Sequence, residues 1–475
     1  MSKSQQKNKE SNTPYKKDDE LLVNIEDISV NGEGIGHVDG YTIFVKDTVP
    51  GDLVKVKIIK AKKTYGYGRL MEIEKESEDR VKPLCAVARQ CGGCQIQHLS
   101  YEKQLLFKQN HVKNCLERIG GIEDAEKYME PIIGMENPYF YRNKAQFPVA
   151  EGKDGSVNVG FYAGRSHSII PADNCYIQAK ENGEIIKLVK EWMNENRVKA
   201  YDEKYQSGIV RHIMTRVGFV TKEVMVCIVI NSTNLNDKLS KALVDKLSKV
   251  NNIASIMLNF NTDNTNVILG QKVQVLYGNG YLSDYIGDIQ YHISPLSFYQ
   301  VNPVQTKKLY DTVLEYAFDD DNKDKVVWDL YCGIGTISLF LAKKAKMVYG
   351  VEIVPEAIDD ARNNAKLNDI YNVQFFCGAA EEVVPSKYEM SGGAISADIV
   401  VVDPPRKGCD EKLLSTIALM KPERIVYVSC DPSSLARDLK WLLANGYEIK
   451  KVRTCDQFCH TIHVESVVKL ESVNN

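Results

Sequence analysis

The C-terminal part of this chain alternates apolar strands with amphipathic helices, and this pattern constrains its fold more than any other feature. From about residue 293, strands such as Val326–Leu330, Asp398–Val402 and Arg424–Ser429 are separated by helical segments such as Pro355–Leu367. Strand–helix alternation is typical of a parallel sheet covered by helices. We therefore expect residues 293–475 to form an α/β domain with a Rossmann-like sheet.

Three of the expected strands end in residues that carry chemistry. One is followed by a loop with Gly333 and Gly335, a second by Asp403 and two prolines, and a third by Cys430. The carboxyl ends of parallel strands meet at one edge of the sheet, where open α/β sheets bind ligands. A glycine loop, a carboxylate and a thiol at one edge indicate covalent catalysis beside a nucleotide-like cofactor.

The glycine loop favours a nucleoside cofactor over a dinucleotide. Glu352 ends the next strand about 20 residues further on, as a carboxylate that binds ribose hydroxyls does. The third glycine of a dinucleotide fingerprint is absent, because Ser338 occupies its place. A cofactor without a pyrophosphate does not need that glycine.

Length, charge and cysteine content restrict the class of protein. A chain of 475 residues is too long for one core, and its net charge of −3 predicts no partner. We find no secretory signal and no apolar run of about 18 residues, and therefore expect no membrane association. We therefore expect a cytoplasmic protein, and in a reducing compartment its twelve cysteines argue against a disulfide framework.

We expect three regions before the α/β domain. Residues 1–19 are polar and read as a disordered tail. Residues 20–75 read as a small β-barrel of about five short strands, of an oligonucleotide-binding type. Residues 76–292 read as a mixed α+β domain, in which an amphipathic helix at residues 100–120 packs on the catalytic domain.

A basic stretch lies within the expected barrel. Between Asp52 and Glu72 the charged residues are all basic: Lys55, Lys57, Lys60, Lys62, Lys63 and Arg69. Either a solvated surface or a nucleic-acid footprint explains such a run.

Three cysteines lie within ten residues, at Cys85, Cys91 and Cys94. A tetrahedral or cubane metal site needs a fourth soft ligand, for which Cys115 and Cys175 are the candidates. Spacing alone does not separate an iron–sulfur cluster from zinc, and three unrelated thiols are the alternative to both.

The sequence from about residue 293 resembles class I S-adenosylmethionine-dependent methyltransferases, and more narrowly the RNA uracil-5-methyltransferase family. The motifs that carry the resemblance occur in the family's order: Phe298–Asn302, Asp329–Thr336, Asp403–Gly408, Ser429–Pro432 and His460–Ser466. The N-terminal barrel resembles a TRAM domain, an RNA-binding module, so that the resemblance covers nearly the whole chain.

The resemblance implies a catalytic pair and a cofactor site. Carbon 5 of uracil is a poor nucleophile until a thiolate adds to carbon 6, and a base must later remove the carbon-5 proton. The family motifs assign these roles to Cys430 and Glu465. They imply that S-adenosylmethionine is bound by Gln300, Tyr331, Glu352 and Asp403.

Two features of the motifs leave alternatives open. Family members often carry Asn where this chain has Asp431, and a negative charge beside Cys430 opposes formation of the thiolate. His460, His463 and Glu465 are also close enough in sequence to be metal ligands, although no third cluster supports them.

The resemblance also bears on the cysteines and the barrel. Many members of the family carry a 4Fe–4S cluster at the positions that match Cys85, Cys91, Cys94 and Cys175. If the barrel is TRAM-like, the basic stretch is expected to contact phosphates. Tyr65 and Tyr67 within it are either stacking platforms for bases or ordinary aromatic residues on the surface of a strand.

We therefore expect a monomeric, S-adenosylmethionine-dependent enzyme that methylates carbon 5 of a uridine in 23S rRNA. Methylation of tRNA is the second choice, and a non-catalytic RNA-binding protein is the alternative from another class. An amino-methyltransferase is disfavoured because Arg406 follows the two prolines, where that chemistry uses an aromatic residue.

Overall fold

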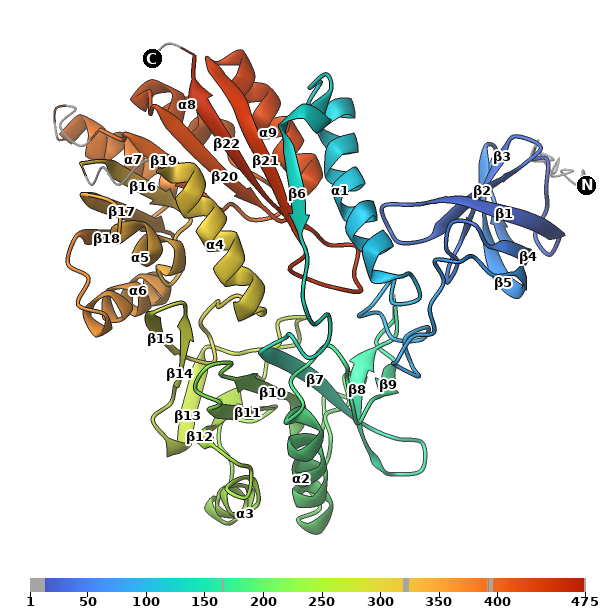
Figure 1. Cartoon of the computed structure of the whole chain (residues 1–475). Helices are drawn as coiled ribbons and strands as arrows, with labels where there is room; N and C mark the ends of the chain where they lie inside the picture. Colours follow the sequence, from blue (N-terminus) through green and yellow to red (C-terminus); the bar gives the residue numbers. More distant parts are fainter. Residues whose placement is uncertain (1–12, 165, 319–323, 391, 393–395, 474–475) are drawn as a thin grey trace, which may run out of the picture. The chain divides into compact units, whose positions relative to one another are not determined.

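The computed structural model describes residues 13–164, 166–318, 324–390, 392 and 396–473. The chain divides into two compact units (Figure 1). Unit 1 comprises residues 1–107 and 460–462, and unit 2 comprises residues 108–459 and 463–475. Each unit is described by itself.

Unit 1 contains, within the described residues, a closed barrel of five strands in the order β1-β2-β3-β5-β4. Its core is built by alternation: Val54, Val56 and Ile58 are fully buried, whereas Lys55 between them is exposed. The predicted small β-barrel is confirmed. The strands are β1 (Glu20–Ile28), β2 (Gly34–Val38), β3 (Tyr41–Val45), β4 (Leu53–Ala61) and β5 (Tyr65–Lys75).

Strand β2 is missing from the sequence prediction because its glycines read as a turn. A Cβ atom on Gly34 would lie 2.1 Å from Thr48 Oγ1, and one on Gly36 would lie 2.3 Å from the carbonyl oxygen of Asn24. The two glycines therefore allow close packing within a strand.

The barrel begins earlier than predicted. The Tyr15 ring packs edge-on against Tyr41 at 5.3 Å between ring centroids, and its hydroxyl donates to Asp39 at 3.0 Å. The Asp18 N–H donates to the carbonyl of Ile58 at 2.8 Å. These contacts correct the expected tail at residues 1–19: residues 13–19 lie on the barrel, and residues 1–12 are outside the described part.

The segment after the barrel belongs to unit 1 as well, which differs from the expected boundary at residue 75. The Arg80 Nε donates to the fully buried carboxylate of Asp52 at 3.1 Å. Ile96 and Leu99 pack with Val49 in a small buried cluster. The first helix, α1 (Tyr101–Arg118), begins in this unit and ends in unit 2.

Unit 2 contains an eight-stranded sheet in the described residues, in the order β18-β17-β16-β19-β20-β22-β21-β6. Strands β18 to β20 are parallel, β22 runs antiparallel to both β20 and β21, and β6 is parallel to β21. This sheet confirms the predicted α/β methyltransferase fold. The strands are β6 (Met129–Ile133), β16 (Val326–Leu330), β17 (Met347–Glu352), β18 (Val373–Cys377), β19 (Ile399–Val402), β20 (Arg424–Ser429), β21 (Tyr447–Cys455) and β22 (Glu465–Ser472).

Helices cover both faces of this sheet (Figure 1). Val401 and Val426 pack in one hydrophobic core with α4 (Pro303–Ala317), α5 (Thr336–Ala342) and α6 (Pro355–Leu367). Val400 and Val402 pack in a second core on the other face. That core contains residues of α1, α7 (Ala380–Met390), α8 (Glu411–Met420) and α9 (Pro432–Ala444).

A second sheet of unit 2 has seven strands in the described residues, in the order β13-β12-β11-β10-β7-β8-β9. Helices α2 (Asn182–Glu195) and α3 (Asp237–Leu247) pack on one face. Met214 and Met225 on the other face join the first core described above. The strands are β7 (Lys144–Glu151), β8 (Val157–Tyr162), β9 (Ile169–Pro171), β10 (Val210–Val217), β11 (Val224–Ile230), β12 (Ile253–Phe260) and β13 (Lys272–Gly278).

Two pieces of the expected central domain, residues 76–292, lie with the catalytic sheet instead. Strand β6 pairs with β21, and the hairpin of β14 (Leu282–Ile286) and β15 (Ile289–Ile293) packs into the core beneath α4 and α6. Helix α1 packs on the other face of the same sheet, through Val112 and Leu116, in agreement with the sequence prediction. The pairing of strands that lie hundreds of residues apart leaves no pattern in the local sequence. Composition therefore did not assign β6 and the β14–β15 hairpin to the catalytic sheet.

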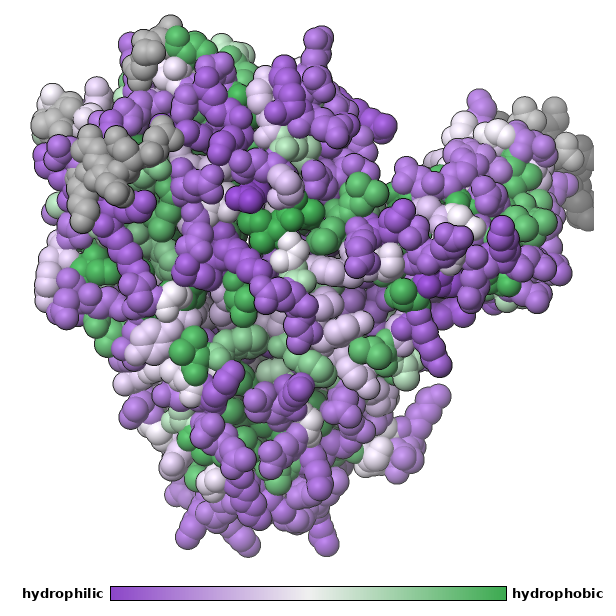
Figure 2. All heavy atoms as spheres, viewed as in Figure 1, coloured by the Kyte–Doolittle hydropathy of each residue, from purple (hydrophilic) through white to green (hydrophobic). Residues whose placement is uncertain are grey.

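Hydrophilic side chains cover most of the surface of unit 2 that Figure 2 shows. None of the helices in the described part of the chain has both the length and the apolar character needed to cross a membrane.

Candidate active site

The carboxyl ends of four parallel strands of unit 2 bring the expected site residues to one edge of the sheet. Leu330 of β16 pairs with Val351 of β17 and Val402 of β19, and Val402 pairs with Tyr427 of β20. The residues that follow these strand ends therefore lie side by side. They are the loop Tyr331–Gly335, Glu352, Asp403 and Cys430.

The glycine loop is held in a left-handed backbone conformation. Tyr331, Gly333 and Gly335 have φ values of 70°, 55° and 81°. The Gly333 N–H donates to Glu352 Oε2 at 3.2 Å, so the two features that predicted a nucleoside site are in contact. A Cβ atom on Gly333 would meet nothing within 4 Å, so the loop borders open space.

Ser338, which stands where a dinucleotide site has its third glycine, has a structural partner. Its hydroxyl donates to the Asp329 carboxylate, and both side chains are fully buried. Burial raises the pKa of Asp329 to about 7, with the hydrogen bond from Ser338 opposing the shift and the charge of Asp403 adding to it. Burial likewise raises the pKa of Asp403 to about 6.

Cys430 and Glu465 lie at the same end of two paired antiparallel strands. Ser429, the last residue of β20, pairs with Ser466, so Cys430 follows that pair on one strand and Glu465 precedes it on the other, and the charge of Glu465 acts on the Cys430 thiol. Burial raises the pKa of Cys430 to about 11, with the charges of Glu465 and Asp403 adding to the shift. Burial, and then the charge of Asp403, raise the pKa of Glu465 well above its usual value. Arg406 lowers the pKa of both groups.

Asp431 has a different role from the one its position suggested. Its side chain caps α9, accepting hydrogen bonds from the Ser433 and Ser434 N–H groups at 3.1 and 2.8 Å. The charges that act on Cys430 are those of Glu465, Asp403 and Arg406. The negative charges that oppose formation of the Cys430 thiolate are therefore those of Glu465 and Asp403.

Hydrogen bonds from Asn143 hold the backbone of the segment that contains Gln300. The Asn143 side chain donates to the carbonyl of Gln300 at 3.0 Å, and the Asn143 N–H donates to that of Val301 at 2.7 Å. The hydrogen bonds thus fix the backbone beside the Gln300 side chain.

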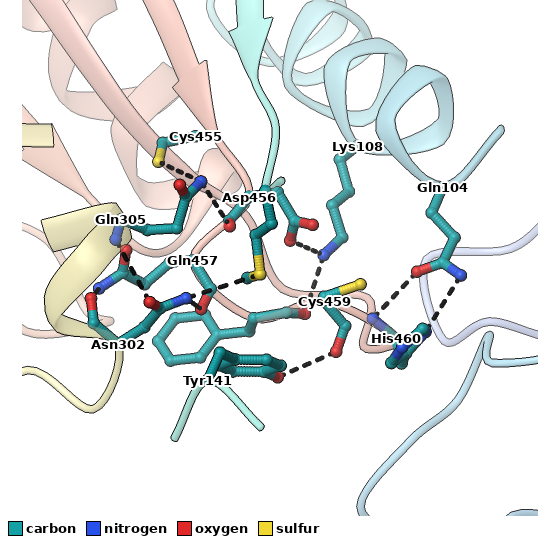
Figure 3. A network of polar contacts seen from close by, with 12 residues as sticks. Gln104, Lys108, Tyr141, Asn302, Gln305, Cys455, Asp456, Gln457, Cys459 and His460 are labelled. Carbon is teal, nitrogen blue, oxygen red and sulfur yellow. Dashed lines mark hydrogen bonds and ion pairs between the residues drawn. The ribbon is translucent and has the colours of Figure 1, made fainter. Parts of the chain in front are cut away.

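A buried network of polar side chains, which no sequence pattern predicted, holds the segment before Glu465 (Figure 3). Lys108 and Asp456 form an ion pair of 2.5 Å between two side chains that are both 0% exposed. Lys108 also donates to the carbonyl of Phe458 at 2.9 Å. A lysine in a helix normally reads as a solvated residue, so its sequence position carried no signal.

Amides of α4 complete this network (Figure 3). Asn302 Nδ2 donates to the carbonyl of Gln457 at 3.2 Å, and Gln305 Nε2 donates to that of Asp456 at 3.2 Å. Asn302 also caps α4, with Pro303 in its first turn. An Asn–Pro pair is a recognised helix start, so this part of the network had a sequence signal.

A model of the tRNA (uracil-5-)-methyltransferase family matches residues 100–473. The chain belongs to this family. A TRAM domain model matches residues 17–71, the region of the closed barrel.

Relatives and solved structures extend the similarity over nearly the whole chain. An uncharacterized RNA methyltransferase of Halalkalibacterium halodurans is 50% identical over 462 residues, which cover 97% of this chain and 99% of that protein. One of Clostridium tetani is 48% identical, covering 96% and 97%. The crystal structure of Pyrococcus abyssi tRNA (uracil-54, C5)-methyltransferase in complex with S-adenosyl-L-homocysteine has a TM-score of 0.76 at 30% identity, covering 94% of this chain and 99% of that one.

In the described part of this uracil-5-methyltransferase, no group of three or more His, Cys, Asp or Glu side chains is arranged to hold a metal ion. The structure therefore does not show the cluster expected at Cys85, Cys91, Cys94 and Cys175, nor the alternative at the C-terminal histidines. Cys85, Cys91 and Cys94 share one loop of unit 1, in which the Gly93 N–H donates to Cys91 Sγ at 3.4 Å. Cys175 belongs to unit 2.

Proposed function

We propose that this enzyme methylates carbon 5 of a uridine in 23S rRNA, with S-adenosylmethionine as the methyl donor and a covalent bond between Cys430 and carbon 6 of the base. The observation that supports this most directly is that Cys430 and Glu465 flank the Ser429–Ser466 strand pair and that the charge of Glu465 acts on the Cys430 thiol. Membership of the uracil-5-methyltransferase family supports the choice of base and of atom.

We propose that Cys430 acts at carbon 6 of the base and Glu465 at carbon 5. The Cys430 thiolate adds to carbon 6, which makes carbon 5 nucleophilic, and carbon 5 then takes the methyl group. The Glu465 carboxylate removes the carbon-5 proton, after which the bond from carbon 6 to sulfur breaks and the thiolate leaves. A carboxylate with a raised pKa suits this role, because it is a stronger base than an ordinary carboxylate.

S-adenosylmethionine supplies an electrophilic methyl group on a sulfonium centre. We propose that Glu352 binds its ribose, that Tyr331 contacts it beside the glycine loop, and that Asp403 and Gln300 orient its polar groups. The open space at Gly333, next to the Glu352 carboxylate, fits a nucleoside. A Pyrococcus abyssi structure of the same family, solved with S-adenosyl-L-homocysteine, supports this choice of donor.

RNA carrying 5-fluorouridine tests the covalent step. Fluorine at carbon 5 blocks the final elimination, so wild-type enzyme with S-adenosylmethionine should accumulate an adduct that migrates slowly in denaturing gels. Cys430→Ala should form none, and Cys377→Ala, which removes an exposed thiol, should react as the wild type does. An adduct that persists in Cys430→Ala would refute the assignment.

The choice of 23S rRNA rests on the combination of the TRAM domain with the cysteine loop. The neighbouring Pyrococcus abyssi enzyme is a tRNA methyltransferase, which makes tRNA the second candidate. Transfer of a tritiated methyl group to unmodified 23S rRNA and to unmodified tRNA, side by side, separates the two. Incorporation into tRNA alone would overturn the first choice.

In unit 1 we propose that the outer face of the barrel binds RNA. Phe44, Tyr65 and Tyr67 form a cluster of three rings, with centroids 5.6 to 5.9 Å apart, that suits stacking on bases. Two of the six basic residues already have acidic partners, because Lys55 pairs with Glu20 at 3.3 Å and Lys57 with Asp18 at 3.6 Å. The phosphate contacts therefore fall to the others: Lys60, Lys62, Lys63 and Arg69.

We also propose a 4Fe–4S cluster held by Cys85, Cys91, Cys94 and Cys175. The support is the family resemblance and the position of three thiols in one glycine-containing loop. Anaerobic purification should give a brown protein with about four irons per chain. A colourless protein that holds zinc would refute the cluster. We further infer a cytoplasmic monomer.

A further inference from the structure

Three basic residues of unit 2, Arg142, Lys144 and Arg216, form a cationic cluster that the catalytic mechanism proposed above does not use. Lys144 of β7 lies directly opposite Arg216 of β10 in the antiparallel register. Directly opposed residues project from the same face of a sheet. Met214, two residues before Arg216, packs on the face turned away from α2 and α3, so both cations belong to that face. The charges of Arg216 and Arg142 both act on Lys144.

In the described part of the chain, the positive charge of this cluster is not neutralised by a carboxylate. Among the described residues, no carboxylate is among the charges that act on Arg216 or on Lys144. Burial lowers the pKa of Arg216 to about 10. Burial, with repulsion from Arg216 and Arg142, lowers the pKa of Lys144 to about 7. Unpaired cations in such a place cost several kcal/mol, which an anion would offset.

The guanidinium group of Arg216 has hydrogen-bond donors that no other described residue uses. Its side chain is 2% exposed, and one of its terminal nitrogens donates to the carbonyl of Ser297. Its Nε and Nη1 atoms are buried and have no hydrogen-bond partner among the described residues. Lys144 and Arg142 are only partly buried, so a ligand has access to the cluster from solvent. Buried donors without partners are uncommon in proteins and mark a place for a ligand or water.

The cluster lies beside the catalytic site. Asn143, between its two N-terminal members, anchors the backbone of Gln300 and Val301 through its side chain and its N–H. The charges of Arg142 and Arg406 both act on His463, and the charge of Arg406 also acts on Cys430. A series of positive charges thus leads from the reactive thiol to the seven-stranded sheet.

We propose that Arg142, Lys144 and Arg216 bind a backbone phosphate of the RNA next to the uridine that is methylated. Arg and Lys donors without an acid match a phosphate, and proximity to Cys430 favours an RNA phosphate over free phosphate. Arg142 and Lys144 contact the phosphate, and the buried Arg216 fixes Ser297 and adds its charge. This inference rests on the proposed function, because it takes RNA as the substrate.

Salt-dependent RNA binding tests the site. Full-length wild type, Lys144→Gln and Arg142→Gln would be titrated with whichever transcript, 23S rRNA or tRNA, accepts methyl groups from the wild type. Each variant should bind about 10-fold more weakly in 0.1 M KCl, and the slope of log affinity against log salt should fall by about 0.7 to 0.9. Lys241→Gln is the matched control, since this exposed lysine lies on α3, which covers the opposite face of the sheet.

Ethylation of single phosphates in the same RNA identifies the contact and separates it from a structural role. Ethylation of one phosphate near the methylated uridine should prevent adduct formation by the wild type. The same ethylation should leave the amount of adduct formed by Lys144→Gln unchanged. Unchanged thermal unfolding of the variants would show that they are folded. Unchanged affinity and salt slope in both variants would overturn the phosphate site alone, whereas a wild type that methylates no RNA would overturn the proposed function.

Discussion

Replacing Glu465 by Gln tests how the active site controls the Cys430 thiol. The pKa of Cys430 is raised to about 11, first by burial and then by the charges of Glu465 and Asp403. At pH 8 a thiol with this pKa is ionised in about one molecule in a thousand. The substitution removes a negative charge that acts on the sulfur and keeps the shape of the side chain.

We expect Glu465→Gln to lower the pKa of Cys430 by about one pH unit, which corresponds to about 1.4 kcal/mol. The thiolate fraction at pH 8 should then rise about tenfold, although the variant should not complete methyl transfer because the base is missing. Asp431→Asn is the matched control. It removes a charge next to Cys430 in sequence that does not act on the thiol, and Asn still caps α9.

The assay is the rate of alkylation of Cys430 by iodoacetamide between pH 7 and pH 11, followed by mass spectrometry of the peptide that carries it. The exposed Cys377 provides an internal reference for reagent reactivity. Identical profiles for the wild type and Glu465→Gln would refute the electrostatic coupling. If the pKa of Cys430 falls as much in Asp431→Asn as in Glu465→Gln, the effect is not specific to Glu465 and the reasoning is refuted.

Three further predictions concern the same unit. Methyl transfer by the wild type should accelerate up to tenfold per pH unit between pH 7 and 9, because the thiolate forms only as pH rises toward about 11; a rate independent of pH would count against Cys430 chemistry limiting the reaction. Lys108→Met should lower the free energy of unfolding in urea by about 3 to 5 kcal/mol, since Asp456 would stay buried without its partner, and the double variant Lys108→Met/Asp456→Leu should recover much of the loss. Gly335→Ala should cost about 1 to 2 kcal/mol and weaken S-adenosylmethionine binding in calorimetry, because Gly335 has φ 81° and a Cβ atom there would lie 3.0 Å from the Phe375 ring; unchanged binding would show that the loop does not contact the donor.

Local pattern was sufficient for the elements of the catalytic sheet. The sequence predicted strands at Val326–Leu330 and Arg424–Ser429 and a helix at Pro355–Leu367, and the structure has these same bounds. Buried parallel strands are continuous apolar runs, and their ends are marked by glycine, proline and polar residues.

The edge of the sheet that carries the site was predictable for the same reason. The residues after β16, β17, β19 and β20 had to share an edge once the strands were parallel. Their motifs also carried the family resemblance, which the match over residues 100–473 confirms. The sequence alone therefore determined the fold class, the family and the positions at which chemistry was to be sought.

Only the tertiary structure decided how charges are distributed around those positions. It placed Asp431 on the amide groups of α9, and it paired Lys108 with Asp456, which is 348 residues away. It also set Lys144 opposite Arg216, where no carboxylate of the described residues is among the charges that act on either side chain. Hydrophobic periodicity reports only on neighbours within a few turns or strand residues, whereas a buried charge depends on partners that the folded backbone brings from distant parts of the chain.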